Sequence, residues 1–158
     1  MDDPRPRRKR IRLPQDVYAL AGQPFFITVC TAQRRHIFAH LRYAEATFTA
    51  LLAGPLFREA ECLAACLMPD HLHLLLTPTD GNLISLLNRW KSFTTNLLHG
   101  MGLRGPIWQR SFHDHALRRD EAVTEVAQYI VENPVRHELV PEWQTYPYAW
   151  LQGASPDP

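Results

Sequence analysis

The chain has 158 residues and a net charge of +1, with 46% hydrophobic and 21% charged side chains, as in one soluble globular domain. The longest apolar stretch, around residues 72–76, is far shorter than the roughly 20 residues of a membrane-spanning helix. The basic N-terminus lacks the apolar region of a secretory signal. The three cysteines form no CxxC motif, so we expect neither a disulfide framework nor a zinc knuckle, and a reducing cytoplasm suits the chain.

The positive charge is concentrated at the N-terminus. Residues 1–12 carry six basic and two acidic side chains, whereas the rest of the chain has a net charge of −3. We expect residues 1–24 to form a basic arm whose cations meet nucleic-acid phosphates. A solubilising tail is an equal alternative on charge alone. The arm's candidate DNA-binding residues are Arg7, Arg8, Arg10 and Arg12.

A second group of basic residues is interleaved with two aromatic side chains. The group consists of Arg104, Arg110, Arg118 and Arg119, around Trp108 and Phe112. Cations and rings together suit single-stranded nucleic acid, because bases stack on rings while phosphates meet cations. Without other evidence, an ordinary solvated surface with one buried tryptophan is favoured.

The first half of the chain predicts a strand, a helix and a hairpin. Residues 25–31 (FFITVCT) are β-branched and aromatic, which predicts a strand. Residues 42–53 place apolar side chains at helical spacing, and Gly54-Pro55 disturbs that helix near its end. Residues 62–68 and 71–77 predict two further strands, joined by a turn at Pro69-Asp70.

The second half predicts two helices and a strand. Asp80-Gly81-Asn82 begins a helix that runs to about Leu98, and a strand follows around residues 107–117. Asp120 is the expected N-cap of the last helix, with Glu121 in its first turn. This helix should end near Asn133, because Pro134 follows. The proline-rich tail, residues 141–158, is expected to lie over the surface. The apolar face of the first of these helices is Leu83, Leu86, Leu87, Trp90, Phe93 and Leu97.

This order of elements, strand–helix–strand–strand–helix–strand, predicts an α+β fold. It is the split βαβ, ferredoxin-like arrangement, an antiparallel sheet with helices on one face. The last helix, which carries Tyr129, is an extra element beyond that core. We expect residues 25–140 to form the main domain between the arm and the tail.

His71 and His73 are the sharpest local feature. Because side chains alternate along a strand, the two imidazoles share one face, while Leu72, Leu74 and Leu76 point to the core. Two imidazoles one residue apart can chelate a divalent cation. A pair of half-exposed surface histidines gives the same pattern, and an isolated HxH favours that interpretation.

His113 and His115 form a competing pair on another predicted strand. Four histidines in two such pairs suggest a metal-dependent hydrolase or oxygenase. Asp114 and His115 are equally compatible with orienting a metal ligand from outside its coordination sphere. Sequence spacing alone does not choose between the pairs.

The last predicted helix places Tyr129 beside its apolar stripe and Asn133 one turn later on the same ridge. There the hydroxyl can face a cleft as a nucleophile beside a metal ligand. The alternative is purely structural: Tyr129 lies at the boundary of the core, and Asn133 ends the helix before Pro134. This alternative is favoured when the helix is considered alone.

Taken together, these segments resemble a known family. Residues 67–75 (LMPDHLHLL) resemble the MPNHxHLL segment of HUH single-strand transposases. Residues 129–136 (YIVENPVR) resemble the YIxxNPVR segment of one branch, the tyrosine transposases associated with repetitive extragenic palindromes (REPs). Further blocks match in the same order, so the resemblance covers about residues 10–150. These blocks are residues 25–31, 90–92 (WKS), 108–115 (WQRSFHDH) and 146–148.

Two positions depart from the family pattern. Glu138 stands where the family often has glycine, and Tyr148-Ala149-Trp150 replaces the usual YPWSS-like ending. Neither touches the residues that would carry the chemistry.

The resemblance implies a metal-dependent endonuclease and strand transferase for single-stranded and hairpin REP-type DNA. Tyr129 would attack a phosphodiester, giving a 5′-phosphotyrosine link and a free 3′-hydroxyl. Mg²⁺ or Mn²⁺ would be held by His71, His73 and Asn133. A phenol with a pKa of about 10 is a poor nucleophile at neutral pH without such help. The resemblance further implies a cytoplasmic, nucleoid-associated protein, acting as a monomer or homodimer and without a membrane partner.

We expect the DNA contacts to come from Lys91 on the polar face of its helix, from Trp108 with Arg110, from Arg118, and from the arm. Two alternatives stay open. One is a non-cleaving nucleic-acid-binding protein or repressor on the same fold. The other is a metal hydrolase of small substrates built on the four histidines.

Overall fold

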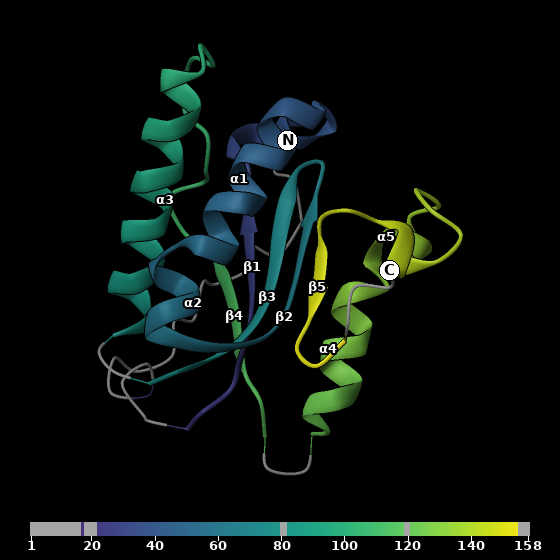
Figure 1. Ribbon diagram of the computed structural model, residues 1–158. Coiled ribbons are helices and arrows are strands. Elements are labelled where there is room, and N and C mark those ends of the chain that lie inside the picture. Colours follow the sequence, from purple (N-terminus) through teal and green to yellow (C-terminus); the bar gives the residue numbers. More distant parts are fainter. Residues whose placement is uncertain (1–16, 18–21, 80–81, 119–120, 155–158) are drawn as a thin grey trace, which may run out of the picture.

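A five-stranded antiparallel sheet forms the centre of the protein, here in a computed structural model that describes residues 17, 22–79, 82–118 and 121–154. The strand order is β4-β1-β3-β2-β5 (Figure 1). The first four strands have the order of the split βαβ core, so the predicted fold is confirmed. The strands are β1 (Phe25–Cys30), β2 (Ala60–Met68), β3 (His71–Pro78), β4 (His113–Ala116) and β5 (Ala149–Leu151).

Helices cover both faces of this sheet (Figure 1). One face carries α1 (Leu41–Ala53), α2 (Pro55–Glu59) and α3 (Leu83–Gly100), and the other carries α4 (Val123–Val131) followed by the single turn α5 (Asn133–Arg136). Within the described ranges, no helix is both long and apolar enough to span a bilayer. The short 3-10 turns are η2 (Ala32–Arg34), η3 (Ile37–Ala39) and η4 (Trp143–Thr145).

The alternation of side chains along β3 separates two apolar cores. Leu72, Leu74 and Leu76 are fully buried on the face of α1 and α3. Leu75 packs with Ala127 of α4 in the smaller core on the other face. Because β2 and β3 are covered on both faces, their sequences are almost continuously apolar instead of alternating. The predicted separation of His71 and His73 from the leucines is confirmed.

The start of α3 follows the expected capping chemistry, but its buried face differs from the predicted one. The Asn82 side chain accepts hydrogen bonds from the backbone N–H groups of Ile84 and Ser85, while Asp80 and Gly81 lie outside the described residues. Phe93 is 50% exposed, whereas Lys91 and Thr94 are buried. Trp108 packs against Trp90 and bonds to Thr94, which rotates the buried stripe away from Phe93.

Gly54 and Pro55 divide the first helical region into two helices. A Cβ atom at Gly54 would collide with the carbonyl oxygen of Ala50, so α1 ends at Ala53 with glycine as its C-cap. Pro55 then opens α2, where its missing N–H costs no helical hydrogen bond.

The predicted bounds of two other elements were wrong. The strand expected over residues 107–117 is limited to β4, and Trp108 forms only an isolated bridge with Thr31. The last helix begins at Val123 with Ala122 as N-cap. Glu121 precedes the helix, where its carboxylate instead accepts the Arg118 backbone N–H, and Asp120 lies outside the described residues.

The tail does not simply lie over the surface. Residues 149–151 form β5, which pairs with β2 and extends the sheet. The Tyr146 hydroxyl donates a hydrogen bond to the Leu67 carbonyl oxygen (2.6 Å), which fixes the approach to β5. Aromatic side chains therefore attach a segment whose proline content suggested a loose tail.

The family departure at Glu138 has a structural consequence that can be tested. Glu138 adopts φ 55° just after α5, a left-handed conformation that costs a non-glycine residue roughly 1–2 kcal/mol. Glycine removes this strain, but it also raises the conformational entropy of the unfolded chain, which lowers the folding stability by about 0.4–1 kcal/mol. We expect Glu138→Gly to stabilise the protein by about 0.5–1 kcal/mol, which raises Tm by roughly 2 °C.

Thermal unfolding followed by circular dichroism measures this change. Glu138→Ala is the matched control, because it removes the carboxylate but keeps the Cβ atom and the strain. A glycine variant that melts no higher than the alanine variant would contradict the explanation.

Candidate active site

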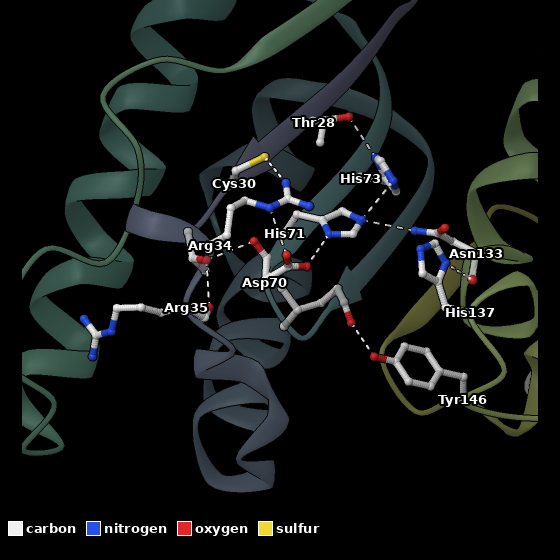
Figure 2. A network of polar contacts seen from close by, with 12 residues as sticks. Thr28, Cys30, Arg34, Arg35, Asp70, His71, His73, Asn133, His137 and Tyr146 are labelled. Atoms are coloured by element: carbon white, nitrogen blue, oxygen red, sulfur yellow. Dashed lines mark hydrogen bonds and ion pairs between the residues drawn. The ribbon is translucent and has the colours of Figure 1, made fainter. Parts of the chain in front are cut away.

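Three side chains from β3 and α5 converge on one point of the sheet face that α4 covers (Figure 2). The Nε2 atoms of His71 and His73 lie 3.1 Å apart. The side-chain nitrogen of Asn133 lies 3.2 Å from His71 Nε2, across 62 residues of sequence. His71 and Asn133 are buried, with 7% and 3% of their surface exposed. The structure thus brings together the three residues expected to bind metal.

Two further side chains orient the imidazole rings from behind. His71 Nδ1 is 2.7 Å from Asp70 Oδ1, and His73 Nδ1 is 2.9 Å from the Thr28 hydroxyl. A carboxylate on one ring nitrogen holds the proton there and leaves the other lone pair free. Neither role was predicted from the sequence: Asp70 was interpreted only as a turn residue, and Thr28 meets His73 only through the register of β1 on β3.

Burial keeps both imidazoles neutral at physiological pH. It lowers the pKa of His73 to about 3, with a further contribution from the neighbouring His71. It also lowers the pKa of His71, against the opposing effect of Asp70. Partial burial raises the pKa of Asp70, but the hydrogen bond from His71 and the charge of Arg34 outweigh it, and the pKa lies below its usual value. Neutral imidazole is the form that binds a metal ion.

The donor set suits Mg²⁺ or Mn²⁺ only moderately, because two of its three members are imidazole nitrogens, which also suit transition metals. Adjacent ligands of an octahedral ion with bonds of about 2.1 Å are about 3.0 Å apart, close to the 3.1 Å between the two ring nitrogens. Among the described residues, no cluster of three or more His, Cys, Asp or Glu side chains is arranged to hold a metal. The Asn133 amide, water and substrate oxygens would therefore complete the coordination, as Mg²⁺ and Mn²⁺ prefer.

Tyr129 lies on the same side of the sheet and is open to solvent, with 52% of its surface exposed. Its ring meets Phe26 edge-on with 6.3 Å between centroids, and Phe26 packs against His73 at 5.3 Å. The Arg136 guanidinium covers the Tyr129 ring, 3.8 Å from its centroid. A second contact, from Arg136 Nη2 to the Tyr129 carbonyl oxygen, measures 2.6 Å. The ring is thus restrained while substrate can still reach it.

The competing histidine pair does not join this site. His113 and His115 are exposed on the edge strand β4, and His115 Nε2 is 2.9 Å from a Glu121 carboxylate oxygen. Asp114, between the two histidines, pairs with Ile27. Ile27 belongs to the core under α1 and α3, on the sheet face opposite to His71 and His73. The structure therefore assembles no four-histidine centre, and it does not place Asp114 or His115 behind the His71–His73 pair.

Two of the expected DNA contacts are parts of the interior. Trp108 is 7% exposed; its ring packs against Phe38 and Trp90, and its Nε1–H donates to Thr94. Lys91 is 9% exposed, and its ammonium donates to the Gln109 carbonyl oxygen. This burial corrects the expectation that Trp108 offers a ring for base stacking and that Lys91 is a free surface cation.

The remaining expected contacts are exposed or lie outside the described residues. Arg110 and Arg118 are exposed. Arg110 borders a groove of about 560 Å³ between the polar side of α3 and residues 106–110. Arg7, Arg8, Arg10 and Arg12 of the arm lie outside the described residues.

His73 should make folding stability depend on pH. Burial lowers its folded-state pKa to about 3, below the ordinary histidine value of 6.5, so the unfolded chain binds the extra proton between these values. The free energy of unfolding should therefore fall as the pH drops below about 6.5, and His73 accounts for up to about 2 kcal/mol of that loss at pH 5.

Urea unfolding at pH 7.5 and pH 5.0 measures this loss. We expect His73→Gln to lose less stability between the two pH values than the wild type does. The control is His113→Gln on the exposed strand β4, which should follow the wild type. An equal loss in the His73 variant would show that the buried imidazole is not responsible.

Comparisons with known proteins agree with this arrangement. No protein-family model matches the chain. The REP-associated tyrosine transposase of Escherichia coli is 28% identical over 132 residues, which cover 84% of this chain and 78% of that protein. A Haemophilus influenzae protein, whose name makes the same assignment provisionally, is 31% identical over 123 residues, covering 61% of this chain and 69% of its own length.

A solved structure gives the same result. It is that of a REP-associated tyrosine transposase bound to a REP hairpin, and it superposes with a TM-score of 0.65 at 26% identity. The match covers 84% of this chain and 78% of that one. The chain therefore belongs to the family of REP-associated tyrosine transposases.

Proposed function

We propose that the protein is a metal-dependent single-stranded DNA endonuclease and strand transferase that acts on hairpin DNA through a 5′-phosphotyrosine intermediate. Tyr129 is the nucleophile, and His71, His73 and Asn133 hold Mg²⁺ or Mn²⁺. The observation that carries the proposal is the convergence of these three side chains within 3.1–3.2 Å. Tyr129, at i−4 from Asn133, lies on the same side of the sheet.

The reaction exchanges one phosphoester bond for another. The Tyr129 oxygen attacks phosphorus, and the bond from phosphorus to the 3′ oxygen breaks. The phenol gives its proton to water and the leaving oxygen gains one, which leaves a free 3′-hydroxyl. Attack by another 3′-hydroxyl reverses these steps and rejoins the strand, so no nucleotide cofactor is consumed. A bound divalent cation supplies positive charge that polarises the phosphate.

The chain's own residues contribute orientation. Asp70 and Thr28 bond to the outer nitrogens, Nδ1, of His71 and His73. The inner nitrogens, Nε2, of both rings therefore face one point. Arg136 restricts the rotation of the exposed Tyr129 ring. Orientation of a nucleophile before the reaction lowers the entropic part of its barrier.

The proposed substrate is a hairpin of the REP type. Its support is the matched solved transposase, which is bound to a REP hairpin. Arg110 beside the groove, Arg118 and the arm at residues 1–12 would meet its phosphates. Such contacts give affinity and register, but they carry no sequence information.

Covalent trapping tests the nucleophile. We expect 5′- and 3′-labelled hairpin DNA, incubated with the protein and Mg²⁺ or Mn²⁺, to give an adduct on a denaturing gel. Tyr129→Phe should abolish the adduct and keep DNA binding, because it removes only the attacking oxygen. His71→Ala should also abolish it. Tyr43→Phe in α1 is the matched control and should react like the wild type.

Each other outcome has a definite meaning. An adduct that survives in Tyr129→Phe would identify a different nucleophile. Binding without an adduct, across a set of hairpins and at any metal concentration, would favour the non-cleaving DNA-binding protein on the same fold.

The salt dependence of binding tests the role of Arg110. If it meets one phosphate, Arg110→Ala should weaken binding similarly for all hairpins. It should also reduce the slope of log K against log salt concentration by about 0.9. Arg58→Ala is the control, because this α2 residue lies outside the groove and its guanidinium caps the Ala53 carbonyl oxygen. An unchanged slope in Arg110→Ala would exclude the phosphate contact.

A further inference from the structure

We propose that Arg34 is a positioning residue for the metal site, acting through Asp70 to fix the orientation of His71. The inference rests on the proposed function, because its consequence is the affinity of the site for a divalent cation. Arg34 belongs to η2, outside both sequence segments that supply the metal-binding residues.

Three side chains, those of Arg34, Asp70 and His71, form a continuous chain of polar contacts at the start of β3 (Figure 2). Arg34 Nε lies 2.9 Å from Asp70 Oδ2, and Asp70 Oδ1 lies 2.7 Å from His71 Nδ1. One carboxylate therefore uses its two oxygens for two different partners. Arg34 Nη1 also donates to Cys30 Sγ at 2.7 Å, so the guanidinium is held at two points.

The backbone that delivers Arg34 is unusual. Gln33 and Arg34 have φ values of 56° and 54°, two consecutive left-handed residues, neither of which is glycine. Such conformations persist only where the surroundings impose them, and they cluster at functional sites. Here they turn Arg34 toward Asp70, while Arg35 extends in a different direction (Figure 2) and donates to the Pro106 carbonyl oxygen.

Two lines of physical reasoning separate this role from that of an ordinary surface ion pair. The Arg34 side chain is 51% exposed, and exposed pairs contribute little to stability. The Asp70 side chain is only 17% exposed and touches His71 directly, so the direction of its carboxylate determines the direction of the ring. Partners that orient metal-binding histidines change metal affinity by 10–100-fold.

The test uses two glycine substitutions in the full-length protein. Glycine accepts a positive φ without strain, so Arg34→Gly should keep the fold while removing the guanidinium. Gln33→Gly is the matched control, because it relieves the strain of the neighbouring left-handed residue and leaves the Arg34 side chain in place. We expect the dissociation constant for Mn²⁺ alone, measured by electron paramagnetic resonance without DNA, to rise about tenfold in Arg34→Gly. It should stay unchanged in Gln33→Gly.

A second readout needs no metal. In ¹H–¹⁵N spectra of the metal-free protein, the His71 Nδ1–H signal should be present in the wild type and in Gln33→Gly. Asp70→Ala should remove it, and Arg34→Gly should broaden it, because the acceptor is then no longer held in place.

The outcomes distinguish this inference from the proposed function. An unchanged Mn²⁺ affinity and an unchanged His71 signal in Arg34→Gly would overturn the inference, whether or not DNA is cleaved. If, in addition, only DNA affinity falls, Arg34 contacts the substrate and is not a positioning residue. If the wild type binds no Mn²⁺ but the His71 signal responds to Arg34→Gly, the proposed metal site is wrong and the positioning role holds.

Discussion

Two neutral imidazoles whose inner nitrogens lie 3.1 Å apart are the constraint on which the rest of the site depends. Facing lone pairs repel unless a hydrogen or a cation lies between them, and buried polar atoms are costly without partners. Asp70, Thr28 and Asn133 supply partners for the ring nitrogens, and the 3.1 Å between the two Nε2 atoms is left for a shared hydrogen or for a cation. This arrangement requires the β2–β3 hairpin, because the same alternation that exposes the imidazoles to α5 buries the leucines of β3 on the other face.

The second face of the sheet carries the candidate site because α4 and α5 pack there. α4 is held over β2 by small side chains, among them Ala64 and Ala127, which permit a close approach. The helix is interrupted at Glu132, and the next turn begins with Asn133 and Pro134. This interruption turns the Asn133 amide inward while Tyr129, one turn earlier, remains accessible. The larger core under α1 and α3 contributes most of the apolar burial, so the reacting face can keep polar and exposed side chains.

Local sequence patterns were sufficient for most of the elements, although not for β5, and for part of the site. Strand alternation placed His71 and His73 on one face, and helical spacing placed Tyr129 and Asn133 on one ridge. What local patterns could not show is contact across elements. Thr28 meets His73 only through strand register, and Arg34 reaches Asp70 only through two left-handed residues.

The wrong predictions for Lys91 and Trp108 have the same physical cause. Lys91 fits the polar face of a helix by periodicity, yet a carbonyl oxygen from residue 109 draws its ammonium inward. Trp108 stands among cations in the sequence, but its ring fills space between Phe38 and Trp90. In both cases a segment distant in sequence decides the environment of the side chain, and amphipathic periodicity contains no information about that segment.

The residue beside His73 on the neighbouring strand bears on which kind of cation the proposed metal site could hold. Cys66 pairs with His73 in register and shares its face, so a thiolate there would turn the site toward soft metals. Burial instead raises the pKa of Cys66 to about 12, and the protonated thiol packs with the apolar residues under α4. A coordinating thiol must lose its proton, which this environment opposes. The donors left for the proposed cation are the two neutral ring nitrogens and the oxygen of Asn133. Rotation of the amide would turn this oxygen toward the site, because the amide nitrogen now faces His71 and the oxygen lies 3.5 Å from Arg136 Nη2.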